Sequence, residues 1–320
     1  MVIAMKKLLL FLLFLFLPLT AFADLEVHFL DVGHGDSTLI ICDGEAMLID
    51  GGDAQASDLI YTVLRDQGVT DLKYVVATHP QADHVGGLPA AFHAATVHAL
   101  YTPVLEYDTE RFATLLDKAE EMSVPVIVPT QGDVLTLGGA TIKILSPGKQ
   151  YSEINDMSIV LRLDYEAHSV LFTGDITKGV EMELVNAGAD LDVDVLKVAH
   201  HGSDTATGID FVAATSPQYA VISCSTRYDN PDEAVLEALY GCCYTRVIRT
   251  DINGNILFHS DGEKLTVTTE AWYIGNINSE IYHRSNCNSA DKMKESNKTT
   301  FYTTHQADYE GYRPCKNCSP

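Results

Sequence analysis

The sequence predicts an α/β fold of the α+β type, in which β-sheets are covered by helices. Short apolar, β-rich runs alternate with segments of helical periodicity from residue 25 to residue 269. Several neighbouring β-rich runs are separated by only a few turn-forming residues, which is typical of antiparallel pairs. Together these observations indicate sheets that bury one face against helices.

Length and charge limit the classes of protein that the chain can be. At 320 residues it can form one large domain, or one domain and a small module. The net charge of −23 argues against a broad electrostatic footprint on nucleic acid, which requires a basic face. It is compatible with a local phosphate-binding site, because bound metal ions can supply the positive charge.

The first 23 residues have the pattern of a secretory signal peptide. Lys6 and Lys7 precede ten apolar residues at 8–17, and Ala21-Phe22-Ala23 is a small-x-small cleavage pattern. The apolar run is shorter than the about 20 residues of a membrane span; the alternative is an uncleaved N-terminal anchor. We therefore expect a bacterial protein that is secreted or periplasmic, has no stable membrane span after cleavage, and begins near Asp24 in its mature form.

The elements of the first half follow from apolar spacing and from turn residues. Strands are expected at 25–30, 37–42, 46–49 and 74–77, and a helix at 57–67 that ends at Gly68. A second helix is expected to begin at Leu88. Further strands are predicted at 97–103, 124–128 and 141–145, with a helix at 108–122.

The second half continues the same alternation. A strand pair is expected at 158–165 and 169–173, followed by a helix at 178–187 and a buried strand at 193–199. Residues 211–214, 219–224 and 233–240 alternate helix and strand, and strands at 247–249, 255–259 and 265–269 close the unit. Three segments are expected: the signal peptide at 1–23, the main domain at 24–270 and a small module at 271–320.

Residues that can bind metal follow several of the predicted strands directly. The strand at 74–77 runs into Thr78-His79-Pro80-Gln81-Ala82-Asp83-His84, and loops at strand ends are where α/β proteins place their chemistry. Imidazole and carboxylate together suit zinc, manganese or iron. Taken alone, the motif is also compatible with a surface turn capped by an aspartate. Metal binding is favoured because Asp50, Asp175 and the pair His200-His201 also lie at strand ends.

These motifs resemble the metallo-β-lactamase fold superfamily and, within it, the ComEC-like branch, which is named for the soluble hydrolase domain of a DNA-uptake channel. The resemblance extends over about residues 25–260. It rests on residues 29–37, 48–52, 79–87, 155–158, 172–175 and 196–203. Their order is specific for the fold and less specific for the function, because one fold hosts many chemistries.

The resemblance implies a four-layer αββα sandwich with one or two divalent metal ions, zinc or manganese, at one edge. It implies His79 on a first metal and Asp175 as a bridge, with the second metal held by Asp83, His84 and His201. His200 is expected to orient this shell. The candidate catalytic residues are Asp83, Asp175 and His200, and the candidate pocket residues are Asp36, Ser37 and Asp50.

The sequence departs from the superfamily pattern at the first metal. Gln81 stands at the second histidine of the His-x-His-x-Asp-His motif, and Asn155 is nearest to the place of another histidine. Both are kept as candidate ligands. An amide in place of imidazole weakens a zinc site and suits a harder ion such as manganese. His168, in a predicted hairpin turn, is expected to be a surface residue.

The function implied is hydrolysis by a metal-activated water, with a phosphodiester as substrate. DNA or a related nucleic acid is the first expectation, in keeping with a role in DNA uptake. Two alternatives stay open. One is hydrolysis of another ester or amide, such as cell-wall phosphocholine or a β-lactam. The other is a non-catalytic protein that binds DNA or cell-wall polymer through a degenerate metal site.

The C-terminal module has the spacing of a zinc site. His283 and Cys287 precede a Cys-x-x-Cys formed by Cys315 and Cys318. A segment this short buries too little core to be stable alone and requires a staple. It resembles the zinc-binding domain of Ada, with His283 in place of that family's first cysteine, and this implies one closed, structural zinc. The alternative is a Cys315–Cys318 disulfide, which an oxidising compartment favours.

Overall fold

The computed structural model describes residues 24–225, 227–243, 245–269, 273–284, 287–301, 307 and 310–318. The predicted signal peptide at 1–23 and the predicted boundary at residue 270 lie outside these described residues. Within the described part of the chain, every helix is too short or too polar to cross a membrane.

One large sheet begins the main domain and has eight strands in the order β17-β16-β1-β2-β3-β5-β7-β8. Its strands from β17 to β3 are antiparallel, and β5, β7 and β8 continue in parallel with β3. The bounds are β1 (Leu25–Phe29), β2 (Thr38–Cys42), β3 (Glu45–Ile49), β5 (Tyr74–Val76), β7 (Leu100–Tyr101), β8 (Val126–Ile127), β16 (Ile256–Ser260) and β17 (Leu265–Thr269).

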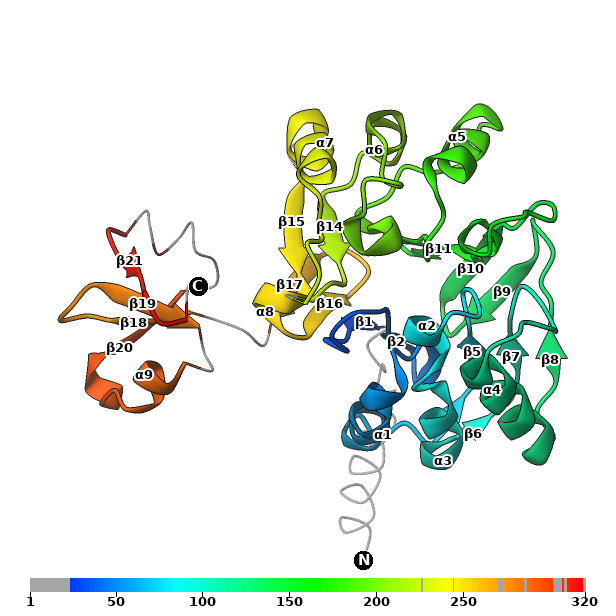
Figure 1. The fold of residues 1–320 in the computed structure, drawn as a ribbon, viewed down its shortest axis with the longest axis horizontal. Coiled ribbons are helices and arrows are strands. Elements are labelled where there is room, and N and C mark those ends of the chain that lie inside the picture. The colour runs from blue at the N-terminus through cyan, green and yellow to red at the C-terminus, as the bar shows by residue number, and fades with distance from the viewer. Residues whose placement is uncertain are drawn as a thin grey trace, which may run out of the picture.

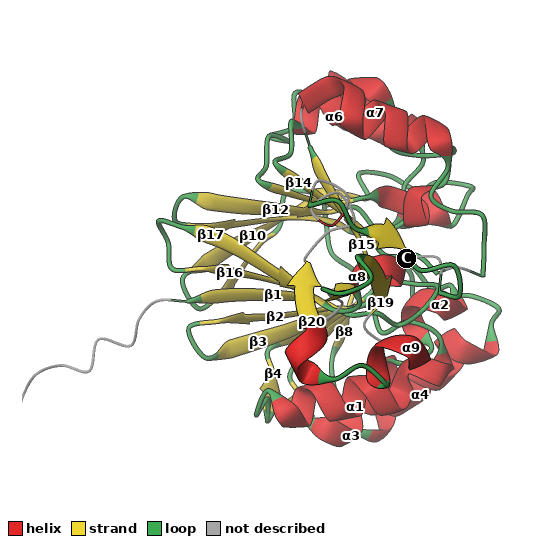
Figure 2. Cartoon of the chain, turned by 90° about the vertical axis from the view of Figure 1, so that its left-hand side faces the viewer, coloured by secondary structure: helices red, strands yellow, loops and turns green. Residues whose placement is uncertain are grey.

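A second sheet of seven strands, in the order β15-β14-β13-β12-β11-β10-β9, stacks on the first (Figure 2). It is antiparallel from β9 to β12 and parallel from β12 to β15. The bounds are β9 (Val134–Leu137), β10 (Ala140–Ser146), β11 (Val160–Tyr165), β12 (His168–Phe172), β13 (Val195–Lys197), β14 (Tyr219–Ile222) and β15 (Arg246–Arg249).

Helices cover the outer face of each sheet and complete the four layers (Figure 2). The first sheet packs on α1 (Ser57–Asp66), α3 (Ala91–Ala94) and α4 (Glu110–Glu121), and the second on α5 (Lys178–Asn186), α6 (Ile209–Thr215) and α7 (Glu233–Cys243). Between the sheets, apolar side chains such as Phe29 and Phe172, whose ring centroids are 6.1 Å apart, form the central core. The predicted αββα fold is therefore confirmed.

Short elements connect these layers. They are β4 (Asp71–Leu72), which pairs with β6 (Thr96–Val97); α2 (Ala82–Val85); α8 (Thr250–Asn253); and the 3₁₀ turns η1 (Ala54–Ala56), η2 (Leu88–Ala90), η3 (Asn155–Met157) and η4 (Ala199–Gly202).

Besides short elements such as β4, α2 and α8, which were not predicted, the structure differs from the predictions as follows. The strand expected at 97–103 is split into β6 and β7, because His98 N–H bonds to Leu72 O in the small sheet whereas Leu100 N–H bonds to Pro125 O in the large one. β9 was not predicted; it is the edge strand of its sheet, and Val134 is 58% exposed. His168 is half-buried rather than on the surface, with Nδ1 2.7 Å from Ser260 Oγ.

The C-terminal residues form a separate four-stranded sheet beside the main domain (Figure 1). Its order is β20-β18-β19-β21, with bounds β18 (Tyr273–Asn276), β19 (Ile281–Arg284), β20 (Lys298–Phe301) and β21 (Arg313–Pro314), together with α9 (Asn288–Asp291) and η5 (Glu295–Asn297). Tyr273, Tyr282 and Phe301 form its small core, against which Ile252 of α8 packs.

Two pairs of glycines bring the end of β3 against the loop that follows β5. Gly51 N–H donates to His84 O at 2.7 Å, and Gly87 N–H donates to Gly52 O at 3.0 Å. A Cβ on Gly87 would lie 2.1 Å from Gly51 O, so only glycine permits this approach. The backbone contact holds Asp50 and His84 at the same edge of the sheet.

Because of this contact, we expect even a methyl side chain at residue 87 to destabilise the protein. Gly87→Ala should lower the free energy of unfolding by about 1–3 kcal/mol, the usual cost of overpacking, measured by urea denaturation of metal-free protein. Gly241→Ala is the matched control, because nothing lies within 4 Å of a Cβ at this position in α7. Equal midpoints for the two variants would contradict the proposed role of the contact.

Candidate metal centre

Loops from both sheets converge at one edge of the sandwich. His79 and His84 follow β5 of the first sheet, and His84 lies in α2. Asp175 follows β12 of the second sheet, and His201 follows β13 within η4. All four side chains are at most 1% exposed. Residues about 90 to 120 positions apart in the sequence therefore meet because the sheets are stacked.

The carboxylate of Asp175 stands at the centre of three imidazoles. Its Oδ2 lies 3.3 Å from His84 Nε2, 3.4 Å from His201 Nε2 and 3.9 Å from His79 Nε2. Within the described residues, His84 Nε2, His201 Nε2 and Asp175 Oδ1 are buried atoms with no hydrogen-bond partner. Buried polar atoms are normally paired. Converging, unpaired imidazole and carboxylate atoms are the donor set that a divalent ion satisfies, and the residues fit that ion.

Electrostatics sets the charge states of Asp175 and His79. Burial disfavours the charged forms, yet the neighbouring imidazoles of His201 and His84 hold the pKa of Asp175 well below its usual range. Burial and the imidazole of His84 lower the pKa of His79 to about 3. His79 is therefore neutral at physiological pH and has a lone pair to offer a metal.

Asp50 fixes the orientation of His84 by contacting Nδ1, the ring nitrogen that does not face the cluster. Its carboxylate accepts hydrogen bonds from Thr78 N–H at 2.8 Å and from Thr78 Oγ1 at 2.7 Å, and its Oδ2 lies 2.8 Å from His84 Nδ1. Ser37 Oγ donates to the Asp50 carbonyl at 3.0 Å. With Nδ1 occupied, His84 presents Nε2 to the cluster, which is the arrangement that carboxylate–histidine–metal groups use.

His200 and His201 occupy a tight turn with left-handed backbone. Their φ angles are 50° and 54°, which non-glycine residues rarely adopt. His201 Nδ1 is held 3.1 Å from Ser223 O, so Nε2 faces Asp175. His200 has its Nδ1 2.8 Å from Thr205 Oγ1 and its Nε2 4.0 Å from Asp175 Oδ2. Strain of this kind is concentrated at functional sites.

The two amides at the predicted first metal lie beside histidines. Gln81 Oε1 is 3.2 Å from His79 Nε2, and Asn155 Nδ2 is 3.5 Å from His200 Nε2. Asn155 Oδ1 is buried without a hydrogen-bond partner among the described residues. Both side chains thus border the cluster, and their role as ligands stays a prediction.

The candidate ligand atoms form more than one set of neighbours. His79, His84 and Asp175 form one set in which the donor atoms lie within 4.8 Å of one another. Asp83 belongs to another set, with its Oδ2 3.5 Å from His201 Nε2. The sequence-based division placed His84 with Asp83 and made Asp175 the bridge between the two metals. Asp175 lies close to His84 and to His201, and the division itself stays a prediction.

Asp36 lies beside His201, with its Oδ1 3.4 Å from His201 Nδ1, and pairs with a lysine that the sequence analysis did not single out. Lys197 is 2% exposed, and its Nζ lies 2.6 Å from Asp36 Oδ2. Despite burial, this ammonium and the imidazole of His201 lower the pKa of Asp36 to about 2. Lys197 lies on a buried strand, shortly before His200 and His201 in the sequence. A lysine within an apolar strand is the sequence signal that could have identified this residue.

An open cleft of about 560 Å³ borders the cluster. Sequence analysis missed the part of its lining that lies outside the recognised motifs, namely Asp53, Gln55, Ser225, Arg227 and Tyr228. Its walls are Val32, Gly33, His34, Asp53, Gln55, Ala82, Asp83, Ser225, Arg227 and Tyr228. Arg227 is the cation among these residues, and its guanidinium lies 5.6 Å from the ring centroid of Tyr228.

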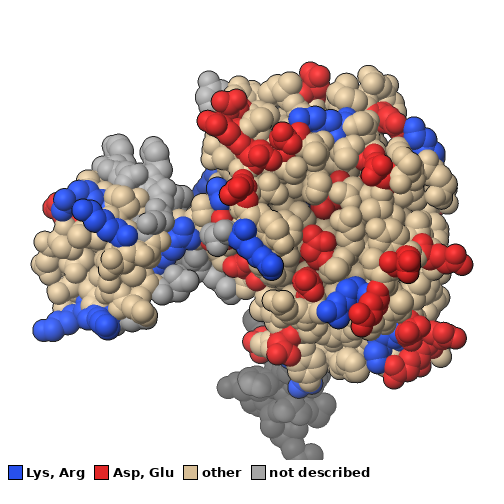
Figure 3. Space-filling model, in the orientation of Figure 1, with Lys and Arg blue, Asp and Glu red and all other residues tan. Residues whose placement is uncertain are grey.

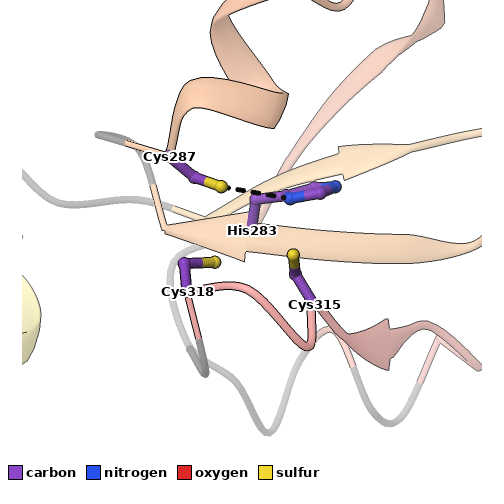
Figure 4. A group of neighbouring side chains, drawn as sticks. All are labelled: His283, Cys287, Cys315 and Cys318. Atoms are coloured by element: carbon purple, nitrogen blue, oxygen red, sulfur yellow. Dashed lines mark hydrogen bonds between the residues drawn. The ribbon is translucent and has the colours of Figure 1, made fainter.

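A second cluster lies in the C-terminal module (Figure 4). His283, Cys287, Cys315 and Cys318 each have a donor atom within 4.8 Å of the others. Backbone N–H groups of Arg284 and Asn317 donate to the sulfurs of Cys318 and Cys315, both at 3.4 Å. Although burial opposes it, hydrogen bonds to Cys287 from Ser289 N–H and His283 lower its pKa to about 6. Cys315 and Cys318 are both free thiols, so the structure lacks the alternative disulfide.

The sequence profile of the metallo-β-lactamase superfamily matches residues 30–226, more than half of the chain. The chain belongs to that superfamily of metal-dependent hydrolases. The profile described as the metal-binding domain of Ada matches residues 265–320, and the four converging donors fit one structural zinc.

The curated relatives place the protein in the ComEC-like branch. ComE operon protein 3 of Bacillus subtilis is 30% identical over 78% of this chain, and competence protein ComA of Neisseria gonorrhoeae is 31% identical over 71% of it. The chain spans only 34% and 31% of the lengths of these two relatives. Among solved structures, the metallo-β-lactamase fold protein YhfI of B. subtilis has 17% identity and a TM-score of 0.51. The match covers 74% of this chain and all of that one, and it supports the fold alone.

The support that Asp50 gives to His84 can be tested by metal affinity. Asp50→Asn removes the charge that orients Nδ1 and should weaken binding of one divalent ion by about 10- to 100-fold, measured by competition with a chromophoric chelator. Asp58→Asn, on the exposed side of α1, makes the same charge change away from the cluster. Unchanged affinity in Asp50→Asn would contradict the role of this carboxylate.

The C-terminal cluster predicts one zinc per module. Cys315→Ser should remove one zinc per chain, measured by elemental analysis after gel filtration, and should expose residues 273–318 to proteolysis because the small core requires the metal. Lys316→Ala is the control, since this neighbouring side chain is exposed. Equal zinc content in the two variants would show that the cluster does not bind the ion.

Proposed function

We propose that this protein hydrolyses phosphodiesters, with DNA or a related nucleic acid as the first substrate class. The observation that supports this most directly is the composition of the cleft, in which Arg227 faces the same space as Asp83 at the metal cluster. A phosphodiester is anionic, and guanidinium groups bind phosphate oxygens through paired N–H groups. Lys197 cannot play this part, because Asp36 neutralises it within the core.

The divalent ion in this proposal supplies an activated water and positive charge. The protein's residues then have separate tasks. Arg227 holds a phosphate oxygen at the mouth of the cleft, while Asp50 and Ser223 keep His84 and His201 oriented. His200 has a side chain that is 29% exposed and an Nδ1 fixed by Thr205, so it is placed to deliver a proton to the departing oxygen.

The proposal also covers where the protein works and which polymer it binds. The signal-peptide pattern at 1–23 supports work outside the cytoplasm, and the names of the competence relatives support contact with DNA during uptake. On the face shown in Figure 3, acidic side chains are spread over the main domain, whereas several Lys and Arg side chains lie on the C-terminal module. The module is therefore the better candidate for holding an anionic polymer, either nucleic acid or cell-wall polymer.

The proposal is tested by comparing substrate classes with the same purified protein. With Mn²⁺ or Zn²⁺ we expect cleavage of bis(p-nitrophenyl) phosphate and of fluorescent DNA, and loss of about 10³-fold in rate or more in Asp175→Ala, since a central charge is removed. A chromogenic β-lactam and a phosphocholine ester serve as comparators. Hydrolysis of either comparator without cleavage of the phosphodiesters would refute the proposal in favour of the other ester or amide. Absence of any hydrolysis in metal-loaded protein would favour the binding-protein alternative.

Arg227 gives a sharper prediction about substrate charge. Arg227→Ala should raise KM for bis(p-nitrophenyl) phosphate by about 10-fold or more, the value of one charge-assisted hydrogen bond, with a smaller change in kcat. Arg246→Ala is the matched control, because that guanidinium also lies over a tyrosine ring, at 5.9 Å from Tyr219, but does not line the cleft. A similar KM for the two variants would exclude Arg227 as the phosphate contact.

A further inference from the structure

His34 projects from the loop after β1 into the metal cluster, although it is not part of the predicted ligand set. Its Nε2 lies 3.6 Å from Asp83 Oδ2, and its ring centroid lies 4.4 Å from that of His201. Nδ1 is buried and has no hydrogen-bond partner among the described residues. The side chain is 24% exposed, so one edge of the ring faces the cleft.

His34, Asp83 and His201 form a set of three donors. One ligand atom of each lies within 4.8 Å of the others, and His201 Nε2 is 3.5 Å from Asp83 Oδ2. Two imidazoles and one carboxylate are the ligands of many divalent transition-metal sites with open positions for water or substrate.

Backbone contacts between two loops hold His34 in this position. Asp36 N–H donates to Asp83 O at 3.2 Å, which ties the loop of His34 to the loop of Asp83. Gly35 has φ of +120°, and a Cβ there would lie 2.1 Å from Asp83 O. The two loops can approach this closely only because residue 35 is glycine. Such contact indicates that the distance between His34 and Asp83 is structurally fixed.

A packing role alone does not account for these observations. The ring of His34 lies between His201 and Tyr228, with centroids 4.4 Å and 4.1 Å away, and stacking explains its plane. Stacking leaves the buried nitrogen and the approach of Nε2 to Asp83 unexplained. The cluster also has amides at positions 81 and 155, where the family resemblance implies imidazoles. His34 supplies a further imidazole, on the side of Asp83 and His201.

We propose that His34 is a metal ligand that completes a three-residue site with Asp83 and His201. The ion in this site is adjacent to a second set, formed by His79, His84 and Asp175, and the carboxylate of Asp175 lies within reach of both. The proposal concerns the metal centre and holds whichever substrate the cleft accepts.

In the test, the full chain is titrated with Mn²⁺, and the electron paramagnetic resonance signal of the free ion is measured at each addition. Mn²⁺ prefers oxygen and imidazole to thiolates, so with zinc in the C-terminal module the titration reports on the main domain. His34→Ala should lose one class of Mn²⁺ site or weaken it by 10-fold or more, and leave the other class unchanged. His98→Ala, an exposed histidine 3.2 Å from Asp71, is the matched control. Equal number and affinity of sites in His34→Ala and the unaltered protein would overturn the proposal.

A second variant separates ligation from packing. Tyr228→Ala removes the ring that stacks on His34 and keeps the imidazole, so it should retain both classes of Mn²⁺ site. In the Co²⁺-substituted protein, His34→Ala should lose one of the hyperfine-shifted imidazole N–H resonances that Tyr228→Ala keeps. Loss of the same Mn²⁺ site in both variants, with all resonances retained in His34→Ala, would assign His34 to packing. If His34→Ala does not fold, His34→Gln takes its place in both measurements and should show the same selective loss.

Discussion

The carboxylate of Asp50 is the constraint on which the metal centre depends. It is fully buried at the end of β3, and burial raises its pKa, which is the penalty for removing a carboxylate from water. Two hydrogen bonds from Thr78 and one contact with His84 Nδ1 offset that penalty. The pKa of His84 is also raised, because Asp175 and Asp50 outweigh the effect of burial. A proton between Asp50 and His84 is thus retained, and it determines which nitrogen of His84 faces the cluster.

The same constraint explains why so many glycines surround the site. Asp50 can reach Thr78 and His84 only if the backbone after β3 touches the backbone after β5, and side chains at Gly51 or Gly87 would prevent this. His34 is brought in by an equivalent contact, between Gly35 and Asp83 O. Both contacts place functional side chains by backbone packing of the loops, and the stacked sheets supply the rigid base.

The sequence was sufficient for the residues that lie directly after strands. His79, Asp83, His84, Asp175 and His201 meet in the structure because the carboxyl ends of β5, β12 and β13 share one edge, and strand–loop patterns reveal such ends. Two kinds of information could not be predicted. The nitrogen of His84 that faces the cluster is set by the contact of the other nitrogen with Asp50. The cleft residues Arg227 and Tyr228 come from a loop without periodicity. The element boundaries were displaced at the short strands β6 and β7, and the exposed edge strand β9 was not predicted.

His34 shows most clearly what sequence patterns leave out. A histidine between two glycines was visible in the sequence, but the same pattern is satisfied by a turn at the surface. Its proximity to Asp83 and His201 becomes evident only when the loop after β1 is placed against α2 and η4.

The two metal-binding clusters are connected through α8. The C-terminal module contacts this helix twice: Arg284 Nη1 donates to Asp251 O at 3.3 Å, and Ile252 packs on the module's core. On the other side of α8, Thr250 Oγ1 accepts from Cys224 N–H and donates to Cys224 O, both at 3.1 Å. Cys224 follows Ser223, whose carbonyl fixes His201. The segment that orients a metal ligand is therefore held by the helix on which the module rests.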